Sequence, residues 1–344
     1  MNRKPIKKET EKQSEQTAST CAAPASGGCV APAAAGPALV KAIAFPVLLF
    51  LAMTVQTGTV SMLLCALAFL SLLGKKPLLR FRQRLCVPVL GLLAFAILYG
   101  AAAIYTPFGA SGLKEFYKFL AAFSLAVILL ARYDREDVPG LLWGFAAISA
   151  IIGIISVDAA SYGPLFSAFN WMANLFGADF STILETESLT RINGIYNDAN
   201  VSGCIFGLGT LVALHLTERP GRTWAVRFAA CSLLGANAMA FFLSLSRGAI
   251  LFFAVACLFW LGTVGKGKRL ALFLRMMAIS MTIVALSIPA IWCIQKGNVL
   301  STVLTMASGV AIFALVGVLD RWLLPLCAHH ERMAVGTVVA VGAM

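Results

Sequence analysis

Residues 138–157 read VPGLLWGFAAISAIIGIISV, a run of twenty positions without a charged side chain. A helix of this length is about 30 Å long, which matches the hydrocarbon thickness of a bilayer. Lipid offers no hydrogen-bond partners to backbone N–H and C=O groups, so an isolated run of this kind must be helical. The stretch therefore predicts a membrane-spanning helix.

Similar apolar runs lie on both sides of this one. Hydrophobic residues make up 60% of the 344 positions and charged residues only 12%, whereas soluble domains average about half apolar and roughly a quarter charged. The composition excludes a water-soluble fold and predicts an all-α polytopic membrane protein with about 10–11 transmembrane helices. The other runs are 39–55, 58–74, 85–105, 116–131, 200–216, 225–245, 248–265, 270–294 and 301–319.

The two ends of the chain differ from these runs. Residues 1–38 are first charged and then rich in Ala, Pro, Gly and Ser, which predicts a disordered cytoplasmic tail rather than a signal peptide. Residues 333–344 begin a further apolar run that is too short to span, so we expect a fragment of a longer protein. The expected domains are the tail, 1–38, and a transmembrane helical domain, 39–344, with an external loop at 158–199.

The distribution of positive charge predicts the orientation. Lys and Arg concentrate in alternate loops, as expected where those loops are cytoplasmic, so we predict a cytoplasmic N-terminus. The net charge of +12 would suggest nucleic acid in a soluble protein, but the topological explanation leaves no nucleic-acid partner to expect. Five of the 27 Lys and Arg residues fall outside the alternation: Lys114, Lys118, Arg191, Arg247 and Lys296.

The external loop is expected to contain a helix of its own. Leu165, Phe169, Met172 and Phe176 recur at helical spacing directly after Pro164. Such a helix either lies on the outer leaflet or packs into the core of a folded loop. The sequence leaves both alternatives open.

Arg191 closes the external loop shortly before a helix that we expect to begin at about Val201. Asn200 or Asp198 is the expected N-cap of that helix. An arginine, a helix N-terminus and a glycine (Gly194) that permits close backbone approach together suit an anion. The alternative is a capped helix with an arginine that reaches the lipid headgroups.

Arg247 lies between two apolar runs that have almost no loop between them. An arginine so close to the membrane must face the protein interior, a water-filled cavity or the headgroups. Its small neighbours Ser246, Gly248 and Ala249 let another element approach. Because Arg247 is expected on the same outer face as Arg191, two guanidinium groups facing one cavity would suit a diphosphate, which each can bind bidentately.

Other polar residues carry weaker predictions. Lys114 would add a third positive charge to this cavity, although Glu115 offers it an ordinary ion pair. His215 lies at the inner end of its run, and His329 and His330 are expected in a cytoplasmic loop. The histidines and cysteines form no metal-ligand pattern, and no phosphate-binding glycine loop is present, so we expect no metal, cofactor or structural disulfide.

Two short motifs resemble the O-antigen ligase and polymerase-like family of bacterial membrane glycosyltransferases. Where the family has a proline between two asparagines, this chain has the dipeptide Asp198-Ala199, and the resemblance covers about residues 110–265. The motifs are Arg191-x-x-Gly194-x-x-Asn197-Asp198-Ala199-Asn200 and, two apolar runs later, Ser246-Arg247-Gly248-Ala249.

The resemblance implies a bundle of the C-type glycosyltransferase kind in a bacterial plasma (inner) membrane. Members transfer a glycan from an undecaprenyl-diphosphate carrier to a glycan acceptor on the outer face, without a metal. Carried over, Arg191 and Arg247 would hold the donor diphosphate and stabilise the leaving group. Asn197 and Asn200 would shape the site, beside Ser246 and Lys114.

One part of the family's site has no counterpart in this sequence. Members place a general base, usually a histidine, on a large external loop near the C-terminus, and no such loop or external histidine occurs before Met344. The catalytic residue therefore stays unassigned. Two alternatives remain: a carrier or flippase for an anionic lipid or solute, and a membrane scaffold whose arginines form structural ion pairs with Asp198, Glu185 or Glu187.

Overall fold

The structure is a computed structural model in which the chain divides into two units, residues 1–40 and 41–344. All contacts described below lie within the second unit. The expected disordered tail falls almost entirely outside the described residues. These are residues 35–54, 58–84, 87–105, 110–175, 192–196, 198–218 and 223–342.

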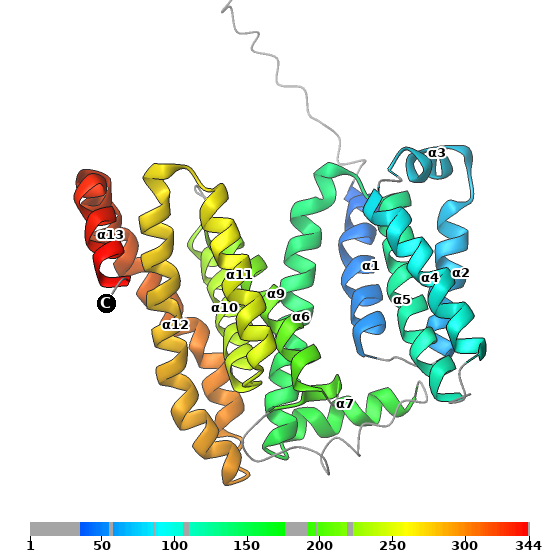
Figure 1. The fold of residues 1–344 in the computed structure, drawn as a ribbon. Coiled ribbons are helices and arrows are strands. Elements are labelled where there is room, and N and C mark those ends of the chain that lie inside the picture. Colours follow the sequence, from blue (N-terminus) through cyan, green and yellow to red (C-terminus); the bar gives the residue numbers. More distant parts are fainter. Residues whose placement is uncertain are drawn as a thin grey trace, which may run out of the picture. The chain divides into compact units, whose positions relative to one another are not determined.

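The described residues form helices joined by short turns, with no strand among them (Figure 1). Each of the ten expected apolar runs coincides with a helix. These ten are α1 (Ala35–Thr54), α2 (Gly58–Leu72), α4 (Val87–Tyr105), α5 (Ala110–Arg132), α6 (Val138–Ala160), α9 (Ala199–Thr217), α10 (Trp224–Leu243), α11 (Arg247–Thr263), α12 (Lys266–Gln295) and α13 (Leu300–Gly342). The other elements are α3 (Lys75–Gln83), α7 (Pro164–Asn174) and the 3-10 turns η1 (Arg135–Asp137) and η2 (Gly194–Tyr196).

Five of the described helices are long and apolar enough to cross a membrane, namely α6, α9, α10, α12 and α13. The number becomes six if α2 and α3 form one bent span. The apolar parts of α1, α4, α5 and α11 are shorter, at 10–17 residues. The prediction of a multi-pass α-helical membrane protein is thus confirmed at the level of five to six candidate spans.

Helix α10 lies at the centre of the second half of the bundle, where it packs against α6, α9, α12 and α13. Small residues make this close packing possible. A Cβ atom on Gly235 of α10 would lie only 2.5 Å from the backbone nitrogen of Gly309 on α13. In an apolar solvent, where hydrophobic burial contributes little between helices, such backbone contact is a main source of packing energy.

A polar contact also crosses the interior of the bundle. The amide of Asn237 on α10 is fully buried and donates from Nδ2 to the carbonyl oxygens of Ala146 on α6 (3.0 Å) and Leu233 (2.9 Å). Gly209 on α9 leaves room for it, because a Cβ there would lie 2.2 Å from the Asn237 Oδ1 atom. Helices α6, α9 and α10 therefore meet around one side chain.

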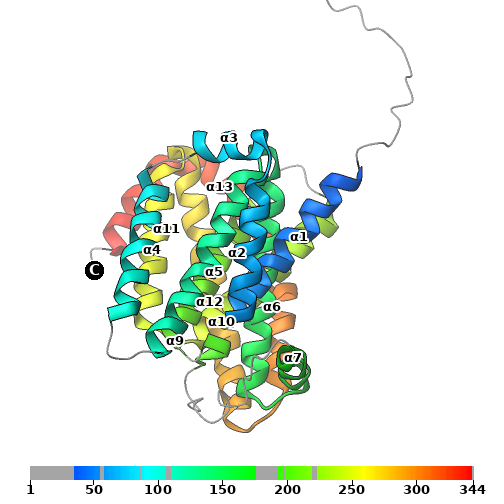
Figure 2. The ribbon, with the colours of Figure 1, turned by 90° about the vertical axis from the view of Figure 1, so that its right-hand side faces the viewer.

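The turns between the described helices gather at two ends of the bundle, as Figure 1 shows. At the end that contains α3, Lys41 pairs with Asp137 at 3.0 Å and Arg84 pairs with Asp134 at 2.6 Å. Helix α7 lies across the opposite end, as Figure 1 shows, and Figure 2 looks along its axis. We name these the α3 end and the α7 end.

A cluster of ion pairs joins four helices toward the α3 end. Arg275 on α12 is buried and contacts both Glu218, which follows α9, and Asp320 on α13. Arg227 on α10 pairs with the same Asp320. Arg275 lies within the predicted run 270–294, and α12, which includes it, begins earlier than predicted, at Lys266. We name Arg227, Arg275, Glu218 and Asp320 the ion-pair cluster.

Residues 75–83 form helix α3, where the sequence indicated only a basic loop. Gly74 adopts φ +104°, a left-handed conformation suited to glycine, and the chain bends by 102° between α2 and α3. Leu, Lys, Arg and Gln are good helix formers, and Pro77 falls in the first turn, where no N–H donor is needed. These helix propensities explain why residues 75–83 form a helix and not the expected loop.

Helix α13 continues from Leu300 to Gly342, whereas the sequence predicted a loop between residues 319 and 333. His329 and His330 consequently lie within a helix rather than in a solvated loop. The connecting residues 320–332 contain no glycine, and their three leucines and two arginines favour a helix, whereas Pro325 among them disfavours one.

Helix α7 confirms the helix predicted in this loop, and the residues of its apolar stripe are divided between buried and exposed positions. Phe166, Phe169 and Ala173 are buried, whereas Leu165 and Met172 are exposed. The buried side is fixed by contact of Phe169 with Phe50 on α1, with ring centroids 6.2 Å apart. The opposite side stays apolar and exposed, so one helix both packs against the bundle and presents an apolar surface.

The carboxylate of Asp158, at the end of α6, holds α7 in place. Asp158 is 1% exposed, accepts a hydrogen bond from the N–H of Phe166 at 2.9 Å and another from the hydroxyl of Thr302 at 2.9 Å. Its negative charge thus lies at the N-terminus of α7, where the helix dipole favours it. The contact connects α6, α7 and α13.

Candidate functional site

The turn between α10 and α11 places Arg247 at the α7 end. Leu245 adopts φ +47°, and its N–H donates to the carbonyl of Phe242 at 3.1 Å, which closes the end of α10. Ser246 then caps α11, because its Oγ accepts the N–H of Ala249 at 3.1 Å. Helix α11 consequently begins at Arg247, so this arginine is the first residue of the helix and not part of a loop.

The N-terminus of α9 has its own cap. The carboxylate of Asp198 accepts the N–H groups of Asn200 at 2.7 Å and Val201 at 3.3 Å, which confirms one of the two expected caps. The helix begins at Ala199, two residues earlier than predicted. The carboxylate stabilises the positive end of the α9 dipole.

These two helix N-termini lie side by side. The hydroxyl of Ser246 donates to Oδ1 of Asn200 at 2.8 Å, while it also accepts the capping bond of α11. Gly203 permits the contact, because a Cβ there would lie 2.7 Å from Cβ of Ala249 and 2.8 Å from Oγ of Ser244. We name this region, centred on Asn200, Ser246 and Arg247, the α9–α11 junction.

Arg247 is exposed at this junction. Among the residues that the structure describes, no carboxylate forms an ion pair with it. Asp198 directs its carboxylate to the cap of α9 instead, and Glu185 and Glu187 lie outside the described residues. The guanidinium thus lies at the N-terminus of α11, next to the α9 N-terminus that the Asp198 carboxylate already caps, and it pairs with no described carboxylate. An exposed guanidinium at a helix N-terminus attracts anions.

Arg191 and Asn197, two of the predicted site residues, lie outside the described residues. The residue that follows Arg191 is described. The N–H of Ile192 donates to the carbonyl of Leu243, the last residue of α10, at 3.2 Å. The chain between the external loop and α9 therefore contacts the α10–α11 turn from which Arg247 projects.

The same segment contains a glycine with a defined role. Gly194 adopts φ +66°, and a Cβ there would lie 2.8 Å from Oγ of Ser156 and 2.9 Å from Oγ of Ser202. Ser202 donates in turn to the carbonyl of Asn193. Gly194 therefore permits close packing against α6 and α9, and the approach of an anion to it stays a prediction.

Tyr196 is a feature that sequence reasoning missed. Its hydroxyl is buried and has no hydrogen-bond partner among the described residues. Burial raises the pKa of Tyr196 far above its ordinary value, so the group remains a protonated donor at all relevant pH values. A buried donor without a partner is uncommon in native structures and requires an explanation. A tyrosine within the first motif was the only signal available in the sequence.

The remaining external cations do not join the junction in the described part of the structure. Lys114 lies near the start of α5, which begins at Ala110 rather than at residue 116 as predicted, and its side chain is outside the described part. Lys296 is exposed after α12, with its Nζ 4.0 Å from the centre of the Trp292 ring. The latter contact is a cation–π interaction within one helix end.

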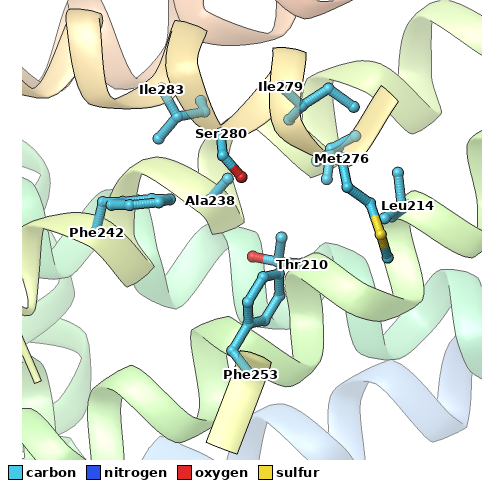
Figure 3. Close-up of a pocket in the computed structure, with 10 residues that line it drawn as sticks. Thr210, Leu214, Ala238, Phe242, Phe253, Met276, Ile279, Ser280 and Ile283 are labelled. Carbon is cyan, nitrogen blue, oxygen red and sulfur yellow. The ribbon is translucent and has the colours of Figure 1, made fainter. Parts of the chain in front are cut away.

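Two apolar hollows lie along the same helices. The first is a cavity of about 20 Å³, room for about one water molecule, lined by four helices that include α9 and α11. Figure 3 shows that Thr210 and Ser280 supply its two hydroxyl groups. The second is a groove of about 330 Å³ between α6, α9 and α11, lined by residues that include Val212, His215 and Trp260.

The junction has the chemistry of an anion-binding site. It offers an exposed guanidinium, two helix N-termini and hydrogen-bonding side chains, and the described residues assign it no general base. No known protein family, curated protein or solved structure matches this chain.

Proposed function

We propose that the α9–α11 junction binds the diphosphate of a polyprenyl-linked glycan, and that the protein is a membrane glycosyltransferase, either a ligase or a polymerase. In this proposal the glycan moves from an undecaprenyl-diphosphate carrier to an acceptor at the outer face of a bacterial plasma membrane. The observation that carries the proposal is the exposed Arg247 beside the N-termini of α9 and α11, where no carboxylate of the described residues pairs with it.

The charge environment supports a strongly anionic ligand. A diphosphate presents several acceptor oxygens, and a guanidinium binds two of them at once. The Ser246–Asn200 hydrogen bond holds the two helix N-termini at a fixed separation, so the site requires little rearrangement on binding. Arg191, two residues before Asn193 on the same segment, is proposed as the second guanidinium.

The apolar groove supports a lipid-linked rather than a water-soluble ligand. Phe259 lines the groove and lies twelve residues after Arg247 on α11, which corresponds to about 18 Å along a helix. A polyprenyl chain whose diphosphate contacts Arg247 would extend along α9 and α11 to this groove. We further propose that all ten apolar helices cross the membrane, in a bundle of the C-type glycosyltransferase kind.

The proposal is tested with the purified chain in lipid vesicles and undecaprenyl diphosphate as the probe. Arg247→Gln should weaken binding by roughly 10-fold to 100-fold, because a hydrogen bond to a charged group contributes about 1.5–3 kcal/mol. Arg269→Gln is the matched control, since Arg269 is also exposed but donates to the carbonyls of Gly262 and Val264. Equal affinity of wild type and Arg247→Gln would refute the diphosphate site.

A second assay separates transfer from transport. Vesicles that contain an undecaprenyl-diphosphate oligosaccharide and an acceptor should yield a new glycosidic bond and free undecaprenyl diphosphate. Movement of the unchanged lipid between leaflets, with no new bond, would instead identify a carrier or flippase. A scaffold would show neither reaction, and Arg247→Gln would then leave binding unchanged.

A further inference from the structure

Helix α3 carries an unusual concentration of positive charge. Lys75, Lys76, Arg80 and Arg82 lie within its nine residues, and Arg84 follows at its end. None of its residues is buried, and the helix contains no acidic residue. The 102° bend after α2 turns it across the end of that apolar helix, as Figures 1 and 2 both show.

Two of the five cations attach α3 to the bundle. Arg80 and Arg84 both pair with Asp134, at 3.0 Å and 2.6 Å. Arg84 also donates to the carbonyls of Leu130 and Tyr133 at the end of α5. These contacts fix the orientation of α3 on the α5–α6 turn.

The other three cations of α3 take no part in these ion pairs and could contact a ligand. Lys75, Lys76 and Arg82 are exposed and form no ion pair with any described residue. Leu78 and Leu79, between them in sequence, are 55% and 54% exposed. Cations interleaved with exposed leucines on a helix that lies across the end of an apolar helix suit the boundary between lipid headgroups and acyl chains.

We propose that α3 is a binding site for anionic phospholipid headgroups in the leaflet at the α3 end. Lys75, Lys76 and Arg82 contact the phosphates, while Leu78 and Leu79 insert among the upper acyl chains. Each cation near an anionic membrane surface strengthens attraction by roughly fivefold. The arrangement thus selects anionic over zwitterionic lipids next to α3, independently of the α9–α11 junction.

The test uses the full chain with Leu78→Trp as a reporter, reconstituted in phosphatidylcholine vesicles that contain a minority of brominated lipid. The signal of the six native tryptophans is subtracted with the chain that lacks the reporter. Brominated phosphatidylglycerol should quench the reporter severalfold more than the same amount of brominated phosphatidylcholine. Molar salt should reduce this preference, because it shortens the screening length to about 3 Å.

Matched variants identify the charges responsible. The combined substitutions Lys75→Gln, Lys76→Gln and Arg82→Gln should abolish the preference, whereas Lys75→Arg, Lys76→Arg and Arg82→Lys should retain it. Arg135→Gln, Lys268→Gln and Arg321→Gln change the net charge equally at exposed positions and should also retain it.

Three outcomes would overturn the proposal. The first is equal quenching by the two brominated lipids in the wild-type background, and the second is an equal loss of preference in the control triple variant. The third is loss of the preference on addition of millimolar inorganic phosphate at constant ionic strength, which would indicate a site for free phosphate. Persistence of the preference under that addition supports the lipid site.

Discussion

Arginines at the two ends of the bundle have opposite surroundings. In the ion-pair cluster, Arg275 is buried and shares its charge with Glu218 and Asp320. At the α9–α11 junction, Arg247 is exposed, and no carboxylate in the described residues neutralises it. The first arginine holds helices together, and the second retains its charge for a ligand. The balance of nearby charge, rather than the presence of an arginine, separates the two roles.

The largest expected effect is a loss of stability when Arg275 is removed from the ion-pair cluster. Arg275→Gln leaves two carboxylates without their partner, and breaking a buried pair costs about 3–5 kcal/mol. Because Glu218 and Asp320 are partly exposed, we expect the lower end of that range. Thermal unfolding in detergent measures the loss, and Arg247→Gln should change stability by less than about 0.5 kcal/mol. Equal destabilisation by both substitutions would contradict the comparison.

A smaller effect is expected from separating the two helix N-termini of the junction. Gly203→Ala inserts a methyl group 2.7 Å from Cβ of Ala249, and overpacking of this kind costs about 1–3 kcal/mol. The substitution should also weaken undecaprenyl-diphosphate binding, since it displaces Asn200 from Ser246. Gly248→Ala is the control, because no atom lies within 4 Å of the added Cβ. If both variants bind equally well, helix proximity is irrelevant to the site.

A third test concerns two residues at the α7 end that have left-handed backbone conformations. Substitution is expected to lower stability at the first position and not at the second. Gly297 adopts φ +61° after α12, and Leu245 adopts φ +47° after α10. A side chain in this conformation costs about 1–2 kcal/mol. Gly297→Ala should therefore destabilise the protein by about 1 kcal/mol, whereas Leu245→Gly should leave stability unchanged or raise it. Chemical unfolding of the two variants checks the signs, and a clear loss of stability in Leu245→Gly would disprove strain at that position.

The smallest effect concerns pH at the α3 end. The hydrogen bond from the Asp134 N–H and the nearby Lys41 ammonium hold the pKa of Asp137 below its usual range. A depressed carboxyl pKa contributes stability above the unfolded-state value of about 3.9, and this contribution is lost as pH falls through the folded-state value. Asp137→Asn should cost at most about 1 kcal/mol at pH 7, and its stability should converge with that of the wild type as the pH falls from about 4 through the folded-state pKa of Asp137. A difference in stability that stays constant as the pH falls below about 4 would assign the effect to packing.

Sequence alone predicted the helices well, because an uncharged run of about twenty residues has only one stable form in lipid. It also isolated Arg247, since a cation outside the charge alternation requires an explanation. It did not predict the ion pairs of Arg275, whose carboxylate partners are 57 and 45 positions away in sequence. The pairing depends on how α9, α12 and α13 pack, which a local pattern does not encode.

Two further features could not be predicted from the sequence, because they depend on how the helices pack. The burial of the Tyr196 hydroxyl, without a hydrogen-bond partner among the described residues, is visible only once its neighbours are placed. The sequence left open which side of α7 faces the bundle, and contact of Phe169 with Phe50 determines it, with Leu165 and Met172 of the same stripe exposed. Where a helix has apolar residues on several sides, its sequence does not determine which side faces the bundle.

The buried Asn237 has a consequence for how the protein is made. A carboxamide in a helix that enters a bilayer alone has few partners, and an interhelical hydrogen bond there is worth about 1–2 kcal/mol at most. The interhelical acceptor of its Nδ2 group is the carbonyl of Ala146 on α6, which is synthesised earlier in the chain. This acceptor is therefore already made when α10 is synthesised. If α10 were made first, the Nδ2 group would have only the carbonyl of Leu233, on its own helix, as an acceptor.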